Sequence, residues 1–108
     1  MRFVLFFVMK KTRYYKIGEA AKRLGLEPYI LRFWEKEFDL LKPVRSSSGQ
    51  RLYTQEHLRL LERIKFLLYE EKLTIQGAKL RLKEEARWLE VFMEVKKELQ
   101  EMLFILKD

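Results

Sequence analysis

Residues 15–38, YKIGEAAKRLGLEPYILRFWEKEF, hold two short helical patterns separated by a glycine. In the first pattern, four apolar side chains recur at the spacing of one helix face: Ile17, Ala20, Ala21 and Leu24. Gly25 follows directly, and glycine accepts the positive φ angle with which many helices end. The pattern therefore predicts a helix over residues 17–24 that is closed by a glycine turn.

The second pattern predicts a helix over residues 28–38, because Pro28 suits the first turn of a helix. One side of this helix is apolar and is expected in the core: Ile30, Leu31, Trp34 and Phe38. The opposite side carries two cations and two aromatic rings: Tyr29, Arg32, Phe33 and Lys36. Exposed aromatic rings favour a partner on this face, with packing of Phe33 under the following loop as the alternative. Two such helices joined by a glycine turn form a helix-turn-helix pattern.

A polar hairpin is expected over residues 45–53, RSSSGQRLY, with two short extended arms around a turn at Gly49. Thr54 is a good N-cap for a helix reaching about Glu71. The predicted buried stripe of that helix is Leu58, Leu61, Ile64 and Leu68. Thr74 is expected to cap a further short helix that runs through Leu82.

The last part of the chain, residues 84–108, carries a heptad pattern. Its apolar positions are spaced 4, 3, 4, 3 and 4 residues apart: Trp88, Phe92, Val95, Leu99, Met102 and Leu106. This spacing favours a coiled-coil dimerisation helix. The alternative is an amphipathic helix that folds back on its own domain.

Positive charge is concentrated in the first half of the chain. The net charge of the 108 residues is +7, and residues 9–60 hold 12 Lys and Arg against 6 Asp and Glu. Residues 61–108 hold 10 of each kind. The asymmetry indicates a polyanionic partner for the first half only.

Several kinds of chemistry are absent from the sequence. The chain has no cysteine, which excludes disulfides and thiolate metal sites and favours a reducing compartment, the cytoplasm. There is no glycine-rich phosphate loop and no Ser/His/Asp set, so no enzyme, no metal and no cofactor is predicted. The single histidine, His57, is expected on an exposed helix turn without a special role.

The first nine residues, MRFVLFFVM, form a short apolar run. The run is far shorter than the roughly 20 apolar residues that span a bilayer, so no membrane partner is expected. Either the natural start is Met9, or residues 1–8 form an extra strand or arm. We assign residues 1–14 to an N-terminal arm.

From Tyr15 to Leu82 the chain resembles the MerR family of bacterial transcription regulators. The residues that carry the resemblance are YKIGEAAKRLGL, LRFWE, GQRLYTQEHLRLLERIKFLL and LTIQGAKLRL. It implies a mostly α-helical fold: a winged helix-turn-helix domain over residues 15–83, with a small β-hairpin wing, and a C-terminal coiled-coil dimerisation helix over 84–108. LRFWE stands where the family more commonly has Arg-Tyr-Tyr-Glu. This LRFWE variant is similar to one branch of the family.

The resemblance implies a recognition helix at residues 28–38 in the major groove and a wing at residues 45–53 across the phosphates. The implied DNA-binding residues are Lys16, Tyr29, Arg32, Phe33, Lys36, Arg45, Arg51 and Tyr53. Phe33 lacks the hydroxyl of the family's tyrosine, so its contact is apolar or lost. Gln50 departs from the family's usual tyrosine, whereas Arg51 and Tyr53 match the pattern of the wing. Tyr53 either donates to a phosphate or packs the wing onto the domain.

The implied function is a homodimeric, sequence-specific regulator that binds double-stranded DNA at a near-palindromic promoter site and distorts it. The implied partners are promoter DNA, a second copy of the chain and RNA polymerase. One alternative is an architectural or excisionase-like DNA-bending protein, and another is a protein-binding adaptor of the same fold. Either the protein lacks a ligand sensor, or the chain is the N-terminal part of a longer regulator.

Overall fold

The computed structural model describes residues 13–107. The predictions for residues 1–8, and nearly all of the predicted N-terminal arm, lie outside the described residues. The chain divides into two compact units between Glu71 and Lys72, and each is described by itself. The boundary predicted between residues 83 and 84 falls instead inside a continuous helix.

The first unit is mostly helical, and its helices begin and end where local chemistry favours it. They are α2 (Ile17–Leu24), α3 (Pro28–Glu37), α4 (Gln55–Lys65) and the π-helix η1 (Phe66–Glu70). Gly25 closes α2 in the left-handed region at φ 69°, and its N–H donates to the carbonyl of Lys22 at 3.2 Å. Pro28 opens α3. Both helices are confirmed, although α3 ends one residue before Phe38.

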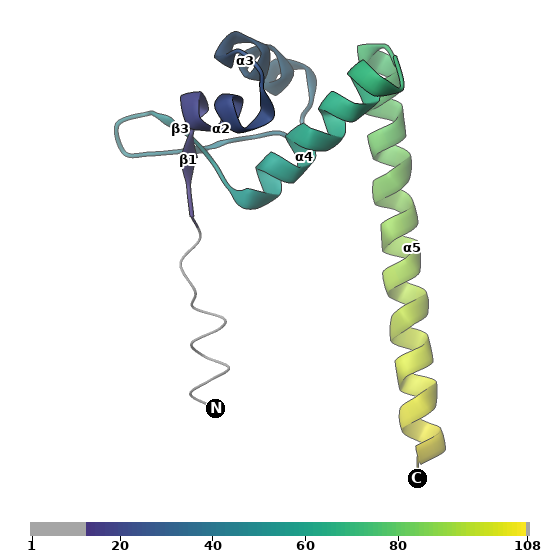
Figure 1. The fold of residues 1–108 in the computed structure, drawn as a ribbon. Coiled ribbons are helices and arrows are strands. Elements are labelled where there is room, and N and C mark those ends of the chain that lie inside the picture. The colour runs from purple at the N-terminus through teal and green to yellow at the C-terminus, as the bar shows by residue number, and fades with distance from the viewer. Residues whose placement is uncertain (1–12, 108) are drawn as a thin grey trace. The chain divides into compact units, whose positions relative to one another are not determined.

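Three short antiparallel strands form a sheet in the order β1-β3-β2. They are β1 (Tyr15–Lys16), β2 (Val44–Arg45) and β3 (Arg51–Tyr53). The hairpin over residues 45–53 is confirmed. The strand β1 was not predicted, because two residues are too few to show an alternating pattern. Helix α2 lies beside β1 and β3, and the loop between β2 and β3 projects away from the helices of this unit (Figure 1).

The core of the first unit lies between these helices and β3. Its buried residues include Ala20, Ala21, Leu24, Leu31, Trp34, Phe38, Leu41, Tyr53, Leu58, Leu61, Ile64 and Leu67. Two residues predicted as core, Ile30 and Leu68, are only half-buried. For Leu68 the reason is the π-helix, whose wider turn changes which side chains face inward after Lys65. Leu67 takes the fully buried position.

The N-terminus of α4 gives His57 a role that the sequence did not suggest. The N–H of His57 donates to the Thr54 hydroxyl at 3.2 Å, and the N–H of Thr54 donates to Nδ1 of His57 at 3.0 Å. This reciprocal capping box satisfies two backbone donors that a helix start leaves unpaired. His57 is half-buried and also meets the Tyr53 ring edge-on, at 6.1 Å between centroids. The expectation of an exposed residue without a role is wrong.

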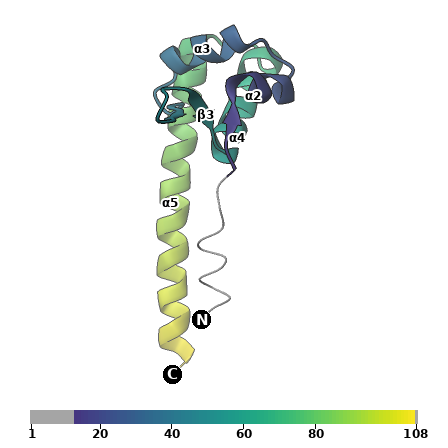
Figure 2. The same cartoon turned by 90° about the vertical axis from the view of Figure 1, so that its left-hand side faces the viewer.

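The second unit is built on one helix, α5 (Ile75–Lys107), of 33 residues (Figure 2). Thr74 stands before its first residue and accepts the N–H of Gly77 at 3.0 Å. The prediction of a separate short helix ending at Leu82 is wrong. No glycine or proline occurs from Ala78 to Lys107, so nothing local ends the helix.

Candidate nucleic-acid interface

The two faces of α3 separate as predicted. Leu31 and Trp34 are buried, and the four residues of the opposite face are exposed: Tyr29, Arg32, Phe33 and Lys36. Tyr29 keeps 66% of its surface exposed and Phe33 keeps 49%. Packing of Phe33 under the following loop is therefore not what the structure has. Helix α3 presents two cations and two aromatic rings to solvent.

Contacts behind α3 hold this face in place. The Trp34 ring lies 6.2 Å from the ring of Tyr69, in a tilted arrangement. Nζ of Lys65 donates to the carbonyl of Leu24 at 2.6 Å, at the C-terminal end of α2. That carbonyl has no partner within the helix, so the ammonium group satisfies it. The helix-turn-helix pair is thereby fastened to α4 and η1.

The wing closes its turn with its own polar groups. The Ser46 hydroxyl accepts the N–H of Gln50 at 3.1 Å, and Gly49 adopts φ 84°. Arg45 is exposed, and its Nη1 donates to the carbonyl of Gly49 at 3.0 Å. Arg45 lies opposite Arg51 in the strand pairing. The wing thus carries two arginines side by side on its short strands.

Arg51 is tied to the recognition helix. Its Nε lies 2.7 Å from Oε2 of Glu35, and the Glu35 side chain keeps only 9% of its surface exposed. Glu35 is the last residue of the LRFWE motif, and no role was predicted for it from the sequence. A signal was present, because Glu35 shares the buried stripe of Leu31, Trp34 and Phe38 at helical spacing. A carboxylate on a buried stripe needs a charged or donating partner.

Tyr53 is wholly buried, with 0% of its surface exposed. Its hydroxyl has no hydrogen-bond partner within residues 13–107. Burial raises the pKa of this hydroxyl, and the nearby Glu35 carboxylate raises it further, while the cations of Arg51 and Arg32 act in the opposite direction. A phosphate contact by Tyr53 is therefore ruled out in this conformation. The alternative, packing of the wing onto the domain, is what the structure has.

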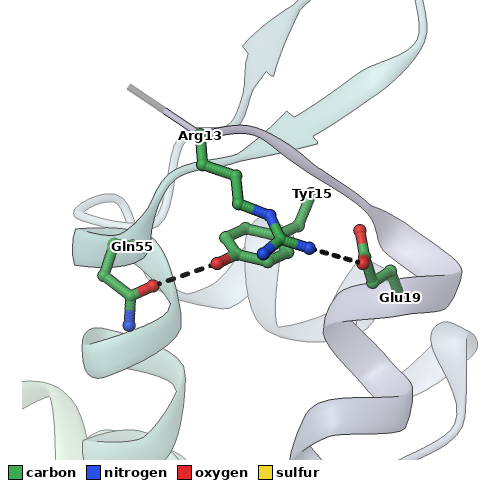
Figure 3. A network of polar contacts seen from close by, with 4 residues as sticks. All are labelled: Arg13, Tyr15, Glu19 and Gln55. Carbon is green, nitrogen blue, oxygen red and sulfur yellow. Dashed lines mark hydrogen bonds and ion pairs between the residues drawn. The ribbon is translucent and has the colours of Figure 1, made fainter. Parts of the chain in front are cut away.

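Lys16 lies exposed at the start of α2, on a strand anchored by a network that sequence reasoning missed (Figure 3). The ring of Tyr15, next to Lys16, has the guanidinium groups of Arg13 and Arg23 each 4.6 Å from its centroid. The Tyr15 hydroxyl donates to Oε1 of Gln55 at 3.2 Å, and Nη2 of Arg13 lies 3.3 Å from Oε2 of Glu19. These contacts fix β1 between α2 and α4.

The predicted seam of α5 is exposed in the single chain. Between 48% and 77% of the surface is open at Trp88, Phe92, Val95, Leu99, Met102 and Leu106. The charged side chains of the same segment are exposed as well. An exposed apolar row of this length favours burial against another surface.

Neither a cluster of metal-binding side chains nor a membrane-spanning helix occurs among the described residues. Within residues 13–107, no group of three or more His, Cys, Asp or Glu side chains is placed to hold a metal ion. In the same part of the chain, no helix combines the length and the apolar character needed to cross a bilayer.

Helices α2 and α3 form a helix-turn-helix pair, and the hairpin of β2 and β3 forms a wing that an ion pair joins to α3. With the long helix α5 that follows, these elements define a winged helix-turn-helix DNA-binding fold. Residues 15–85 match the family described as MerR HTH family regulatory protein. The chain belongs to the MerR family.

Similar proteins agree with this assignment. The chain is 34% identical over 68 residues to the HTH-type transcriptional repressor CarH of Myxococcus xanthus, covering 63% of this chain and 23% of CarH. It is 37% identical over 59 residues to the HTH-type transcriptional regulator ZntR of Escherichia coli strain K12, covering 55% of this chain and 40% of ZntR. The chain thus spans less than half the length of these relatives, whose names describe regulators.

A solved structure extends the likeness to most of the chain. It is that of HiNmlR, a MerR family regulator lacking the sensor domain, bound to promoter DNA. The TM-score is 0.60 at 25% sequence identity, and the match covers 88% of this chain and 76% of HiNmlR.

Proposed function

We propose that this protein is a homodimeric, sequence-specific regulator of transcription that binds a near-palindromic site in promoter DNA. The observation that carries the proposal is the outward face of α3, where Tyr29, Arg32 and Lys36 are exposed while Leu31 and Trp34 fix the helix in the core. The likeness to HiNmlR, which is bound to promoter DNA, supports it. Such a regulator works in the cytoplasm, at the nucleoid, and RNA polymerase is its expected further partner.

The exposed residues divide into two tasks. In a major groove, Arg32 and Lys36 suit the acceptor atoms of guanine, and Tyr29 and Phe33 offer apolar contact. Arg45, Arg51 and Lys16 suit phosphate oxygens, because cationic donors to phosphate fix register and orientation without reading the sequence. The balance of 12 basic against 6 acidic residues in residues 9–60 supports the same partner.

Dimerisation would cover the exposed row from Trp88 to Leu106. A two-stranded coiled coil buries such a row against a second copy. Two identical domains held by a two-fold axis read two half-sites of opposite orientation, so the DNA site is a near-palindrome. Distortion of that site follows if the two domains cannot both reach straight DNA, and phosphate contacts then offset its cost.

The residues that flank the seam favour an antiparallel pair. In a parallel pair, flanking positions five residues apart face each other, which sets Leu89 against Glu84 and Leu103 against Glu98. In an antiparallel pair centred on Lys97, Leu89 meets Leu103 of the second copy instead. Because the chain has no cysteine, single cysteines at Phe92 and Met102 test this. We expect a disulfide when the two variants are mixed, and disulfides within each variant alone would support a parallel pair.

The first test is selection of genomic DNA fragments, followed by footprinting and by affinity across a salt series. If Lys16, Arg45 and Arg51 each contact a phosphate in both protomers, about 6 contacts give a log–log slope of about −5. A protected near-palindrome with that slope supports the proposal. Tandem or weakly specific sites would favour an architectural protein, and no selected site would favour a protein-binding adaptor.

Two arginine variants distinguish contacts with bases from contacts with phosphates. Arg45→Ala should weaken binding to selected and random DNA alike, because Arg45 is exposed on the wing. Arg32→Ala should also change the preferred sequence, by about 1–3 kcal/mol if Arg32 contacts a base in bidentate fashion. Equal losses on both DNAs for both variants would remove Arg32 from the base-reading residues.

A further inference from the structure

Glu35 is a charged residue on the inner side of the recognition helix. Its neighbours on the same stripe, Leu31, Trp34 and Phe38, are buried, and 9% of its own side chain is exposed. An ionised carboxylate in such surroundings is unfavourable without a partner. Arg51 supplies that partner at 2.7 Å, from a strand of the wing.

The link between Glu35 and Arg51 matters because no strand pairing joins the wing to α3. Strand β3 is paired with β1 on one side and with β2 on the other. Side chains must therefore set the spacing between the wing and α3. The Glu35–Arg51 ion pair joins them directly, and the buried Tyr53 ring lies beside it on the same strand.

The atoms used in the ion pair leave Arg51 able to bind elsewhere. Nε points to Glu35, and a guanidinium group has four further N–H donors on its two Nη atoms. The Arg51 side chain keeps 30% of its surface exposed. A carboxylate that holds Nε fixes the plane of the guanidinium group, so the remaining donors are already oriented for a phosphate.

We propose that Glu35 is a positioning residue for DNA recognition, which holds Arg51 so that α3 and the wing meet the duplex in one register. The inference rests on the proposed function and deepens it. Glu35 itself touches no DNA. It acts on sequence discrimination, because a wing that is free to shift on the phosphate backbone lets α3 settle on incorrect base pairs.

The test compares two substitutions that remove the same charge. Glu35→Gln breaks the ion pair, whereas Glu27→Gln alters an exposed carboxylate at the N-cap of α3 that makes no capping hydrogen bond. Affinities for the selected site and for random DNA are measured at one salt concentration, beside thermal unfolding. We expect Glu27→Gln to leave the ratio of the two affinities unchanged. Glu35→Gln should lower that ratio about tenfold, the loss typical of a charge-assisted hydrogen bond.

Two further variants separate positioning from charge and from folding. Glu35→Asp keeps the charge but shortens the side chain, so the affinity ratio should still fall, and a wild-type ratio would overturn the inference. In an Arg51→Gln background, Glu35→Gln should change the ratio less than twofold, because Glu35 acts through Arg51. A roughly tenfold fall of the affinity ratio on adding Glu35→Gln to Arg51→Gln would also overturn the inference. A wild-type protein that binds selected and random DNA alike would instead overturn the proposed function.

Discussion

The two tryptophans of this chain lie in opposite surroundings. Trp34 in α3 keeps 2% of its surface exposed, whereas Trp88 in α5 keeps 71%. Both occupy apolar positions of a helical pattern. The difference is that the first unit buries Trp34, with the Tyr69 ring of η1 6.2 Å away, while the described residues leave Trp88 open. A periodic apolar face indicates that a helix packs against something, but it does not indicate which molecule covers that face.

The largest effect is expected from truncating these two residues. Trp34→Ala should lower the free energy of unfolding of the first unit by about 3–5 kcal/mol, because it leaves a cavity in the core. Trp88→Ala should leave that unit's unfolding unchanged and weaken self-association instead. Chemical denaturation of dilute protein and sedimentation equilibrium measure the two quantities. Equal destabilisation by both variants would mean that Trp88 packs within its own chain.

A charge in the seam gives the next largest effect. Val95→Asp should raise the dimer dissociation constant about 100-fold, because each protomer would bury an unpaired carboxylate. Gln100→Asp introduces the same residue at an exposed position outside the seam and is the control. Analytical ultracentrifugation reads out both variants. A matching response from the control would show that net charge, and not burial, drives the change.

A smaller effect is expected at the two threonine caps. Thr54→Ala should cost about 1 kcal/mol of stability, because the Thr54 hydroxyl accepts the N–H of His57 and also contacts Nδ1 of the His57 ring. Thr74→Ala removes a single hydrogen bond to Gly77 and should cost less. Thermal unfolding compares them, with Thr54→Ser as the variant that keeps the cap. Loss of stability in Thr54→Ser would point to packing of the threonine methyl group.

The smallest effect at neutral pH is expected from Tyr53→Phe. The buried hydroxyl has no hydrogen-bond partner in residues 13–107, so its removal should change stability by less than about 0.5 kcal/mol. Above about pH 10 the wild type should lose more stability than the Tyr53→Phe variant. The folded-state pKa of Tyr53 is raised, so its contribution is full below about pH 10 and is lost as the pH rises through that raised pKa. Parallel pH profiles of the two proteins would contradict this.

The sequence predicted those parts of the molecule that depend on neighbours a few residues away. The helix over residues 17–24, the turn at Gly25 and the separate faces of α3 all follow from helical spacing and backbone preference. The parts that it missed join distant residues. Tyr15 pairs with Tyr53 in the sheet, and Arg51 reaches back to Glu35. Such contacts depend on how the chain folds back on itself, which local patterns do not contain.

The same contrast between local patterns and distant contacts applies to the candidate site. The exposure of Tyr29, Arg32, Phe33 and Lys36 follows from the helical wheel alone. Tyr53 was left with two roles, because a tyrosine on a short strand is compatible with either face. The continuity of α5 was missed because Thr74 and the change of pattern after Leu82 suggested two helices.

That continuity constrains how the length of the protein can change. Ala78 and Leu82 are buried, and the row from Trp88 to Leu106 follows on the same unbroken helix. One residue inserted between Lys83 and Arg87 would rotate the row by about 100° relative to Ala78, whereas seven would restore its direction to within about 20°. Relatives that differ in length within this segment should therefore differ by steps such as about seven or eleven residues, which return the row to nearly its original direction.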